Sequence, residues 1–183
     1  MAKVSVLGSG GWGTAVAVML SNNGHDVTLW SFLESEMMDL AKYRENKPFL
    51  PGIKIPENIK LTSKLSECGD VDIAVIATPS HGVRAVAKNF SQFAKKDLIV
   101  LNISKGIEEK TYMTLSNVLK EELPQCRIAV MSGPSHAEEV SRGIPTTNVV
   151  ASDYLDVAEY IQDVFMNSCM RVYTNTDITG VEL

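Results

Sequence analysis

The feature that most constrains the fold of this chain is an alternation of short apolar runs with helical patterns along almost its whole length. One run, "VDIAVIATPS" at 71–80, reads as a continuous apolar strand, as expected when both faces of a parallel sheet are covered. Residues 81–93 follow with apolar side chains at helical spacing. Repeated β-α units of this kind form a mainly parallel sheet covered by helices, so we expect an α/β fold.

Composition and charge narrow the class of protein. The chain has 183 residues, 45% hydrophobic and 21% charged, which is enough to bury the core of one sizeable domain. Its net charge is -5 and it has no run of lysines or arginines, so we expect no nucleic-acid partner. No apolar stretch approaches the roughly 18 residues that span a bilayer. The start "MAKVSVLG" carries no signal peptide, so we expect a cytoplasmic protein without membrane insertion.

The three cysteines, Cys68, Cys126 and Cys169, are odd in number and widely spaced. None of them belongs to a C-x-x-C pair or lies near a pair of histidines. The pattern favours reduced thiols over a disulfide framework, and it predicts no metal site.

Several segments carry the start and stop signals of single elements. The small, apolar residues 12–24 predict a helix that is buried against the sheet and ends at Gly24. Ser31 and Glu34 have the S-x-x-E spacing of a capping box, which predicts a helix running to about Tyr43. Residues 44–57 contain three prolines and a glycine, so we expect a long irregular loop, of the kind that often serves ligands.

The stretch "VLGSGGWGTA" at 6–15 follows the first predicted strand directly. Gly8, Gly10 and Gly13 have G-x-G-x-x-G spacing at the mouth of a helix, where backbone N–H groups and the helix dipole favour a pyrophosphate. A plain tight turn between strand and helix is the alternative. The position at the first β-α junction favours dinucleotide binding, and with it a Rossmann-type, doubly wound sheet.

The residues after the second predicted strand bear on which nucleotide is bound. An acidic residue about 20 positions after the glycines suits the ribose hydroxyls of NAD, and an arginine there suits the 2′-phosphate of NADP. The sequence here reads Ser31-Phe32-Leu33-Glu34. Glu34 is a candidate ribose contact, although the capping box gives it a structural role instead. The lack of a basic residue at Phe32 or Leu33 weakens the case for NADP.

Further candidates follow the later strands, at the edge where ligands bind in open α/β sheets. Thr78 and Pro79 turn the chain where the cofactor is expected, but they also fit an ordinary strand-ending turn. Lys105 places a cation at a strand end, where it can polarise a carbonyl or neutralise a phosphate; the alternative is a solvated lysine. Gly133 and Ser135 open a further helix, whose N–H groups can hold a substrate oxygen.

Ser135 also has S-x-x-E spacing with Glu138, which predicts a capping box for a helix that begins at Ser135. Glu138 and Glu139 suit the N-terminus of that helix, so we do not expect them to form a catalytic acid pair. His136 has no obvious acidic partner in the sequence and is expected to be structural.

Several blocks of the sequence together resemble NAD(P)-dependent glycerol-3-phosphate dehydrogenase of the bacterial type. They are "GSGGWGTA", "LPG" after an asparagine-containing loop, "SKGIE", "SGPSHAEEV" followed by "PTT", and "YTNTDITGVEL". "SGPSHAEE" is far more specific than the glycine motif, and the resemblance spans essentially all 183 residues. It implies an enzyme that reversibly reduces dihydroxyacetone phosphate to sn-glycerol 3-phosphate with NADH or NADPH, for glycerophospholipid synthesis.

The resemblance also implies roles for residues by their position. Contacts with the cofactor are implied at Gly8, Gly10, Gly11, Trp12, Gly13, Phe32, Leu33, Thr78, Pro79, Lys105 and Ala137. Lys105 is implied to act in catalysis and to contact the substrate, together with Gly133 and Ser135. The basic residue that the family has after the second strand falls at Leu33, with Phe32 before it, so a preference for NADP does not carry over.

In the family, the segment that matches the end of this sequence continues into a glycine-rich stretch and then an all-helical substrate domain. A lysine in that stretch is the main proton donor and acceptor, and it would fall beyond Leu183. The resemblance therefore implies that residues 1–183 are the NAD(P)-binding Rossmann domain of a longer enzyme, truncated near the start of the helical domain. It implies that the isolated chain is inactive, and it is compatible with a homodimer at full length.

Two other functions fit parts of the sequence. A Rossmann domain can sense NADH and control a partner, but such a sensor would bring an effector segment, such as a basic winged helix, and none is visible. A 6-phosphogluconate or β-hydroxyacid type dehydrogenase shares the fold and the glycine loop, but "SGPSHAEE" argues against it.

Overall fold

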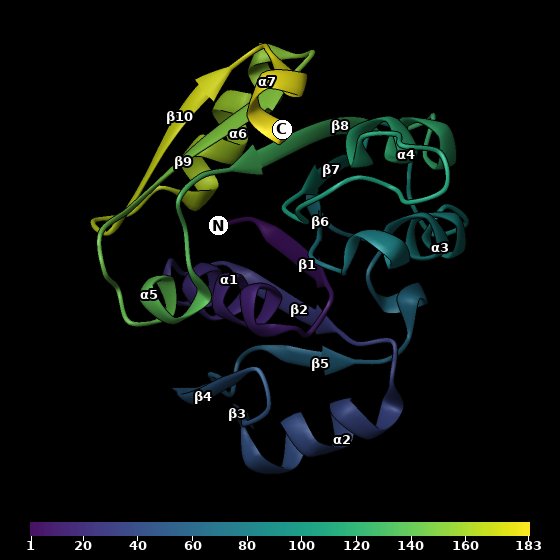
Figure 1. Cartoon of the computed structure of the whole chain (residues 1–183). Coiled ribbons are helices and arrows are strands. Elements are labelled where there is room, and N and C mark those ends of the chain that lie inside the picture. The colour runs from purple at the N-terminus through teal and green to yellow at the C-terminus, as the bar shows by residue number, and fades with distance from the viewer.

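An eight-stranded sheet runs through the centre of the computed structural model, which describes all residues 1–183 (Figure 1). Its strands are β1 (Lys3–Leu7), β2 (Asp26–Trp30), β5 (Lys60–Thr62), β6 (Ile73–Ile76), β7 (Ile99–Asn102), β8 (Arg127–Ser132), β9 (Thr146–Ser152) and β10 (Met170–Asn175). Their order is β10-β9-β8-β7-β6-β1-β2-β5, and every neighbouring pair is parallel except β8 and β9. The predicted α/β fold with a mainly parallel sheet is confirmed.

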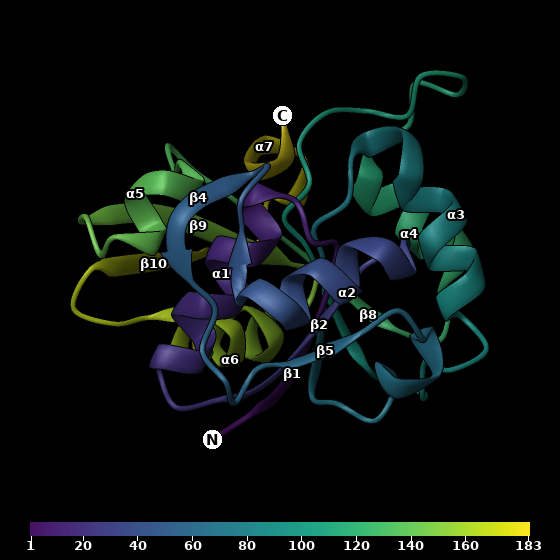
Figure 2. The ribbon, with the colours of Figure 1, turned by 90° about the horizontal axis from the view of Figure 1, so that it is seen from below.

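Helices cover both faces of this sheet. They are α1 (Gly11–Asn22), α2 (Glu34–Tyr43), α3 (Ser80–Phe90), α4 (Leu115–Glu122), α5 (Ala137–Ser141), α6 (Leu155–Phe165) and α7 (Ile178–Glu182), with a short 3-10 helix, η1, at Leu65–Glu67. Figures 1 and 2 show α3 and α4 together on one side of the sheet and α1 and α6 on the other. None of the helices combines the length and the apolar character that a membrane crossing requires.

The strand β6 shows how the sequence pattern builds these layers. All four of its residues are buried, as the continuous apolar run predicts. Ile73 and Val75 belong to the core that α1 and α6 share. Ala74 and Ile76 point the other way, into the core formed with α3 and α4. Side chains that alternate along one strand therefore hold both helical layers.

The sheet is doubly wound about β1. The chain passes from β1 to β2 and β5 on one side, and then returns to place β6 on the other side of β1. The loops after β1 and β6 consequently leave the sheet next to each other, at the switch point where open α/β sheets bind ligands. They pack so closely that a Cβ on Gly8 would overlap the carbonyl group of Ala77, and Gly8 has a positive φ of 132°.

The predicted capping box of Ser31 and Glu34 is wrong. The helix α2 begins at Glu34 itself, after an extended Leu33, and no side chain caps it. The Ser31 hydroxyl donates to the Glu36 carboxylate at 2.5 Å instead, and it accepts from the Leu33 N–H at 3.3 Å. The hydroxyl is thus engaged by Glu36, two residues after Glu34 in the first turn of the helix.

Two further local expectations need correction. Residues 44–57 are not one irregular loop, because β3 (Glu45–Asn46) and β4 (Leu50–Lys54) pair as an antiparallel hairpin within them. The helix expected from Ser135 begins at Ala137 and has only five residues. Ser135 caps nothing, since its hydroxyl donates to the Asn148 side chain at 3.1 Å, so its predicted box with Glu138 does not form.

Candidate functional site

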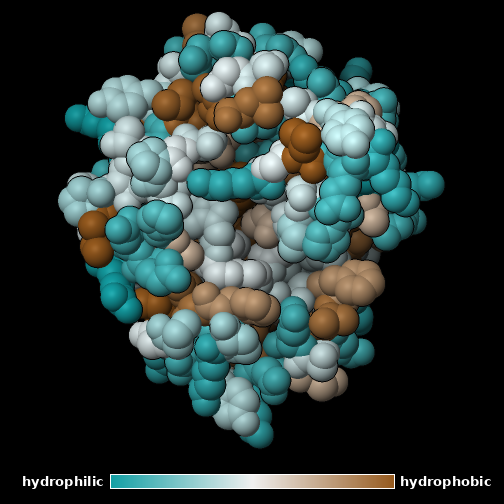
Figure 3. All heavy atoms as spheres, in the orientation of Figure 1, coloured by the Kyte–Doolittle hydropathy of each residue, from teal (hydrophilic) through white to brown (hydrophobic).

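A cavity of about 730 Å³ lies at the edge of the sheet where β1, β2 and β6 end. Its walls come from the loop after β1, the residues after β2, the loop after β6 and the helix α3. Figure 3 shows the face drawn in Figure 1 hollowed near the end of β1, with pale spheres of intermediate hydropathy at the bottom of the hollow. Its position at the switch point and its size are those of a small-molecule site.

The three glycines of the G-x-G-x-x-G motif are not equivalent. Gly8 is required by the contact with Ala77, and a Cβ on Gly13 would overlap the carbonyl oxygen of Gly8. Gly10, by contrast, has no atom within 4 Å of the place where its Cβ would lie. Its backbone is extended, with φ -65° and ψ 179°, which any residue can adopt. Nothing in the fold therefore explains Gly10, whereas the close approach of a ligand to the backbone does.

The helix α1 opens toward this position without a cap. No side chain accepts from its first turn, which contains no acidic residue, and Gly10 stands at the N-cap. The first backbone bond at this end runs from the Thr14 N–H to the Gly10 carbonyl at 2.9 Å. The N–H groups before Thr14 and the positive end of the helix dipole can therefore hold an anion such as a pyrophosphate.

Two buried polar atoms in the walls of the cavity have no partner. They are the indole Nε1 of Trp30, a residue only 3% exposed, and the Oγ1 of Thr78. Buried donors are nearly always hydrogen-bonded in folded proteins, so these two indicate a missing group. The residues present thus fit a ligand with an anionic centre at Gly10 and further acceptors nearby, as a nicotinamide dinucleotide has.

The hairpin of β3 and β4 supports the glycine loop from outside. Asn46, which is 3% exposed, donates to the Ser9 carbonyl at 2.7 Å and to Thr14 Oγ1 at 2.8 Å. A Cβ on Gly11 would lie 2.6 Å from the Phe49 carbonyl oxygen, so the hairpin packs directly on this glycine. The segment expected to be an irregular ligand loop is instead an ordered brace for the dinucleotide loop.

The acidic side chain at the cavity is Glu36 rather than Glu34. The hydroxyls of Ser9 and Ser31 both donate to Glu36 Oε2, at 3.1 and 2.5 Å. Glu34 is exposed and does not line the cavity. Sequence analysis missed Glu36 because it took Ser31 as the N-cap of α2, whereas the structure has Leu33 at that position.

The predicted cofactor residues fall into three groups. Those that line the cavity are Gly8, Gly10, Phe32, Thr78 and Pro79. Those that build the loop behind it are Gly11 and Gly13, with Ala137 3.8 Å from the place of a Cβ on Gly11. Those that the structure leaves outside the lining are Trp12, which packs against the core, Leu33, which is 47% exposed, and Lys105.

The predicted substrate residues come together at the next strand ends. Lys105 Nζ donates to the Gly133 carbonyl at 3.4 Å, and the Ser135 hydroxyl approaches the same oxygen at 3.5 Å. A Cβ on Gly133 would overlap the Thr147 carbonyl oxygen, so β9 requires glycine there. Asn148, which sequence analysis missed, fixes the Ser135 hydroxyl from β9. We call Lys105, Gly133 and Ser135 the strand-end cluster.

The loop that carries Lys105 is anchored at both ends. Asn102 bonds to the Ser104 N–H and carbonyl, each at 3.2 Å, and so forms the turn before Lys105. After Lys105, the loop residue Glu108 forms a bidentate ion pair with Arg84 of α3, at 2.7 and 2.8 Å. The Arg84 guanidinium lowers the pKa of the Glu108 carboxyl from 4.5 to about 2. The lysine is therefore exposed on a loop whose ends are held.

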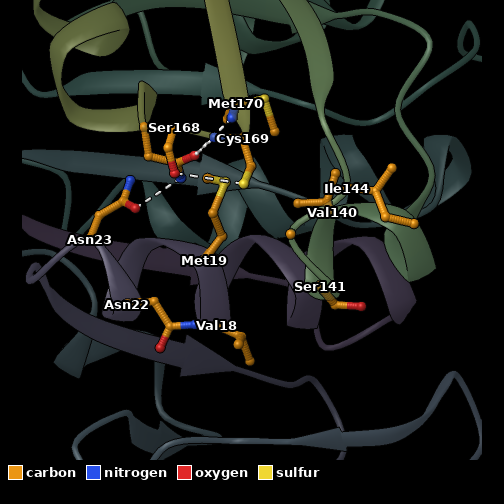
Figure 4. A pocket seen from close by; sticks show the side chains of 12 residues that line it. Val18, Met19, Asn22, Asn23, Val140, Ser141, Ile144, Ser168, Cys169 and Met170 are labelled. Carbon is orange, nitrogen blue, oxygen red and sulfur yellow. Dashed lines mark hydrogen bonds between the residues drawn. The ribbon is translucent and has the colours of Figure 1, made fainter.

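A second cavity, of about 340 Å³, lies at the other end of α1. Figure 4 shows its lining side chains coming from α1, α5 and the segment before β10, and Asn167 donates to Asn23 at 2.9 Å beside it. None of its lining residues is acidic or basic, and the helix end that faces it is the C-terminal one. It lacks the features that hold a dinucleotide.

All three cysteines have free thiols in the structure. Burial raises the pKa of the Cys68 thiol to about 12 and that of Cys126 to about 11. Both are therefore protonated at neutral pH and poor nucleophiles.

A family model described as the N-terminus of NAD-dependent glycerol-3-phosphate dehydrogenase matches residues 3–158. The chain belongs to this family. The match covers the glycine loop, the Lys105 loop and the strand-end cluster, so the site described above lies within the family's own domain. The family match favours a glycerol-3-phosphate dehydrogenase over an NADH-sensing module or a 6-phosphogluconate type dehydrogenase.

Individual relatives agree with this assignment. Glycerol-3-phosphate dehydrogenase [NAD(P)+] of Fusobacterium nucleatum is 47% identical over all of this chain and 56% of its own length. A second enzyme of that name, from Lactobacillus delbrueckii subsp. bulgaricus, is 48% identical over all of this chain and 56% of its own length.

The crystal structure of glycerol-3-phosphate dehydrogenase from Coxiella burnetii superposes with a TM-score of 0.93 at 30% identity, over 99% of this chain and 56% of that one. The present chain thus spans about half the length of the proteins that it matches.

Proposed function

We propose that this chain is the cofactor-binding part of an NAD(P)-dependent glycerol-3-phosphate dehydrogenase, with NADH or NADPH in the 730 Å³ cavity. The observation that carries the proposal is Gly10, which has open space at the uncapped N-terminus of α1. The pyrophosphate would lie against the backbone there. Trp30 and Thr78 would donate their unpaired hydrogens to the same ligand.

The reaction we propose is the reversible reduction of dihydroxyacetone phosphate to sn-glycerol 3-phosphate. The nicotinamide cofactor supplies the hydride chemistry when bound. Lys105, an exposed cation 3.4 Å from the Gly133 carbonyl, would stabilise negative charge on the substrate's oxygen or phosphate. Gly133 and Ser135 would orient the substrate beside it.

The proposal assigns residues 1–183 to the cofactor domain and places proton transfer on residues beyond this sequence. It is supported by the relatives, since the chain matches only 56% of each of the two bacterial enzymes compared. We further propose a cytoplasmic location and a homodimer at full length.

The test is a titration of the 183-residue chain with NADH and with NADPH, followed by an assay of dihydroxyacetone phosphate reduction. We expect binding without turnover, because general acid catalysis alone is typically worth about 10² to 10⁴ in rate. Failure to bind either nucleotide would contradict the cofactor assignment. Substantial turnover would show that the acid lies within these residues.

A further inference from the structure

Glu36 occupies a position in the cavity that the proposed function leaves without a role. It lies in the first turn of α2, half-buried, between the Ser9 hydroxyl of the glycine loop and the Ser31 hydroxyl after β2. Both hydroxyls donate to the same carboxylate oxygen, Oε2. Oε1 accepts no hydrogen bond, and no lysine or arginine pairs with the carboxylate. One oxygen is therefore held in place while the other remains free.

Glu36 is the only acidic residue in the wall of the cavity. The wall has 20 residues, and among them His81 is the only other titratable side chain, since no lysine or arginine is present. Lys64 lies in sequence between the lining residues Ser63 and Leu65, but its side chain is exposed and does not line the cavity. A group carrying extra negative charge would meet a carboxylate in this wall and no lysine or arginine.

The position of Glu36 is fixed relative to the pyrophosphate site. Ser9, which contacts it at 3.1 Å, is the residue directly before Gly10. In a dinucleotide, the adenosine ribose is joined to the pyrophosphate through its 5′-oxygen, so that ribose must lie next to the Gly10 site. The residues after β2 are where such folds contact the ribose.

We infer that Glu36 determines which nucleotide this chain selects. Its free oxygen accepts a hydrogen bond from the 2′-hydroxyl of NADH, and its charge repels the 2′-phosphate of NADPH, which carries about two negative charges and no donor. The inference rests on the proposed function, which requires only that one of the two nucleotides binds. The inference adds that NADH is bound in preference to NADPH and that Glu36 determines this preference.

The alternative is that Glu36 only braces α2 against the glycine loop. The variant Glu36→Gln separates the two roles, because an amide oxygen still accepts from Ser9 and Ser31 but the charge is gone. Glu34→Gln is the matched control, since it removes the same charge from the same helix at an exposed position outside the cavity. Thermal unfolding of each variant checks that the fold is retained.

The experiment is a titration of the wild-type chain and both variants with NADH and NADPH. We expect the wild type and Glu34→Gln to prefer NADH by about tenfold or more, which is about 1.4 kcal/mol. We expect Glu36→Gln to reduce the preference below about threefold, chiefly through tighter binding of NADPH. A preference unchanged in Glu36→Gln, or a wild-type preference for NADPH, would overturn the inference and leave the proposed function intact.

A second measurement on the wild type alone does not depend on how the variants fold. Adenosine 5′-monophosphate and adenosine 2′,5′-bisphosphate differ only in the 2′-phosphate, and each can compete with NADH for the adenosine half of the site. We expect the monophosphate to compete about tenfold better or more. Equal competition would contradict the role of Glu36, whereas failure of the chain to bind NADH or NADPH at all would contradict the proposed function itself.

Discussion

The glycine loop at 8–13 and the strand-end cluster of Lys105, Gly133 and Ser135 both follow strands of one sheet, but they are built differently. The glycine loop is one continuous segment at the start of the 12-residue helix α1. The strand-end cluster joins separate segments, and its helix α5 has five residues. The first offers backbone N–H groups, and the second an exposed cation held by one bond of 3.4 Å. A pyrophosphate site can thus be specified locally, whereas the substrate cluster depends on contacts between distant segments.

The largest expected effect is on the stability of the fold, and it distinguishes two residues of the glycine loop, Gly13 and Gly10. We expect Gly13→Ala to destabilise the chain by about 3 kcal/mol or more, because the new Cβ would overlap the Gly8 carbonyl oxygen. The matched variant Gly10→Ala adds the same methyl group to open space and should change stability by about 1 kcal/mol or less. Denaturant unfolding measures both. Equal effects would show that the two glycines are not divided between packing and ligand approach.

A substitution in the strand-end cluster should lower the turnover rate of the enzyme rather than the stability of the fold. In a dehydrogenase that contains this chain, we expect Lys105→Ala to lower turnover of dihydroxyacetone phosphate about a hundredfold, or about 3 kcal/mol, through loss of a charged donor. Its stability should change by about 0.5 kcal/mol or less, as for other exposed residues. Steady-state kinetics and thermal unfolding test the two halves. Near-normal turnover would make Lys105 an ordinary solvated lysine.

A smaller effect is expected at Glu182, which ties the end of the chain to the Lys105 side of the sheet. Its carboxylate accepts from the Ser116 N–H at 2.8 Å in the first turn of α4, and from Asn102 at 3.4 Å. Glu182→Gln should cost about 1 kcal/mol, because it weakens a charge-assisted cap of α4. The exposed Glu159→Gln is the control in denaturant unfolding. If both variants lose the same stability, Glu182 does not act as a cap.

The smallest effect is the pH dependence of the stability that the Arg84–Glu108 ion pair gives to the Lys105 loop. The pKa of Glu108 is lowered from 4.5 to about 2 by Arg84. A carboxyl with a lowered pKa in the folded state contributes its stability above its ordinary pKa and loses it as the pH falls toward the lowered one. The stability difference between the wild type and Glu108→Gln should therefore be constant near neutral pH and shrink below pH 4.5. A difference independent of pH would contradict this anchor.

Sequence patterns predicted the elements whose partners are neighbours in the chain. The glycine loop, the buried helix α1 and the apolar strand β6 were all predicted, because their periodicity and turn residues act locally. The two S-x-x-E pairs were misread. Ser31 and Ser135 satisfy their hydroxyls with Glu36 and Asn148, and the spacing of residues alone cannot reveal such partners.

The parts of the site that were missed share one property. Each of them contacts the site from another segment of the chain. Asn46 and Glu36 reach Ser9 from the hairpin and from α2, and Asn148 reaches Ser135 from β9. Their signals in the sequence are single polar residues without a pattern. Helix α7 was also missed, although Asp177 caps it by accepting from the Gly180 N–H at 2.9 Å. A cap of this kind can be recognised from the sequence, whereas the contacts of Asn46 and Asn148 require the fold.

The central claim is that Gly10 is glycine for a dinucleotide and not for the fold. It is tested most directly by titrating the wild-type chain and Gly10→Val with NADH while following the thermal unfolding of each. We predict similar unfolding temperatures, because the valine side chain starts in open space, and an affinity for NADH lowered by at least about a hundredfold, or about 2.8 kcal/mol. Unchanged NADH affinity in a folded Gly10→Val chain would contradict the account.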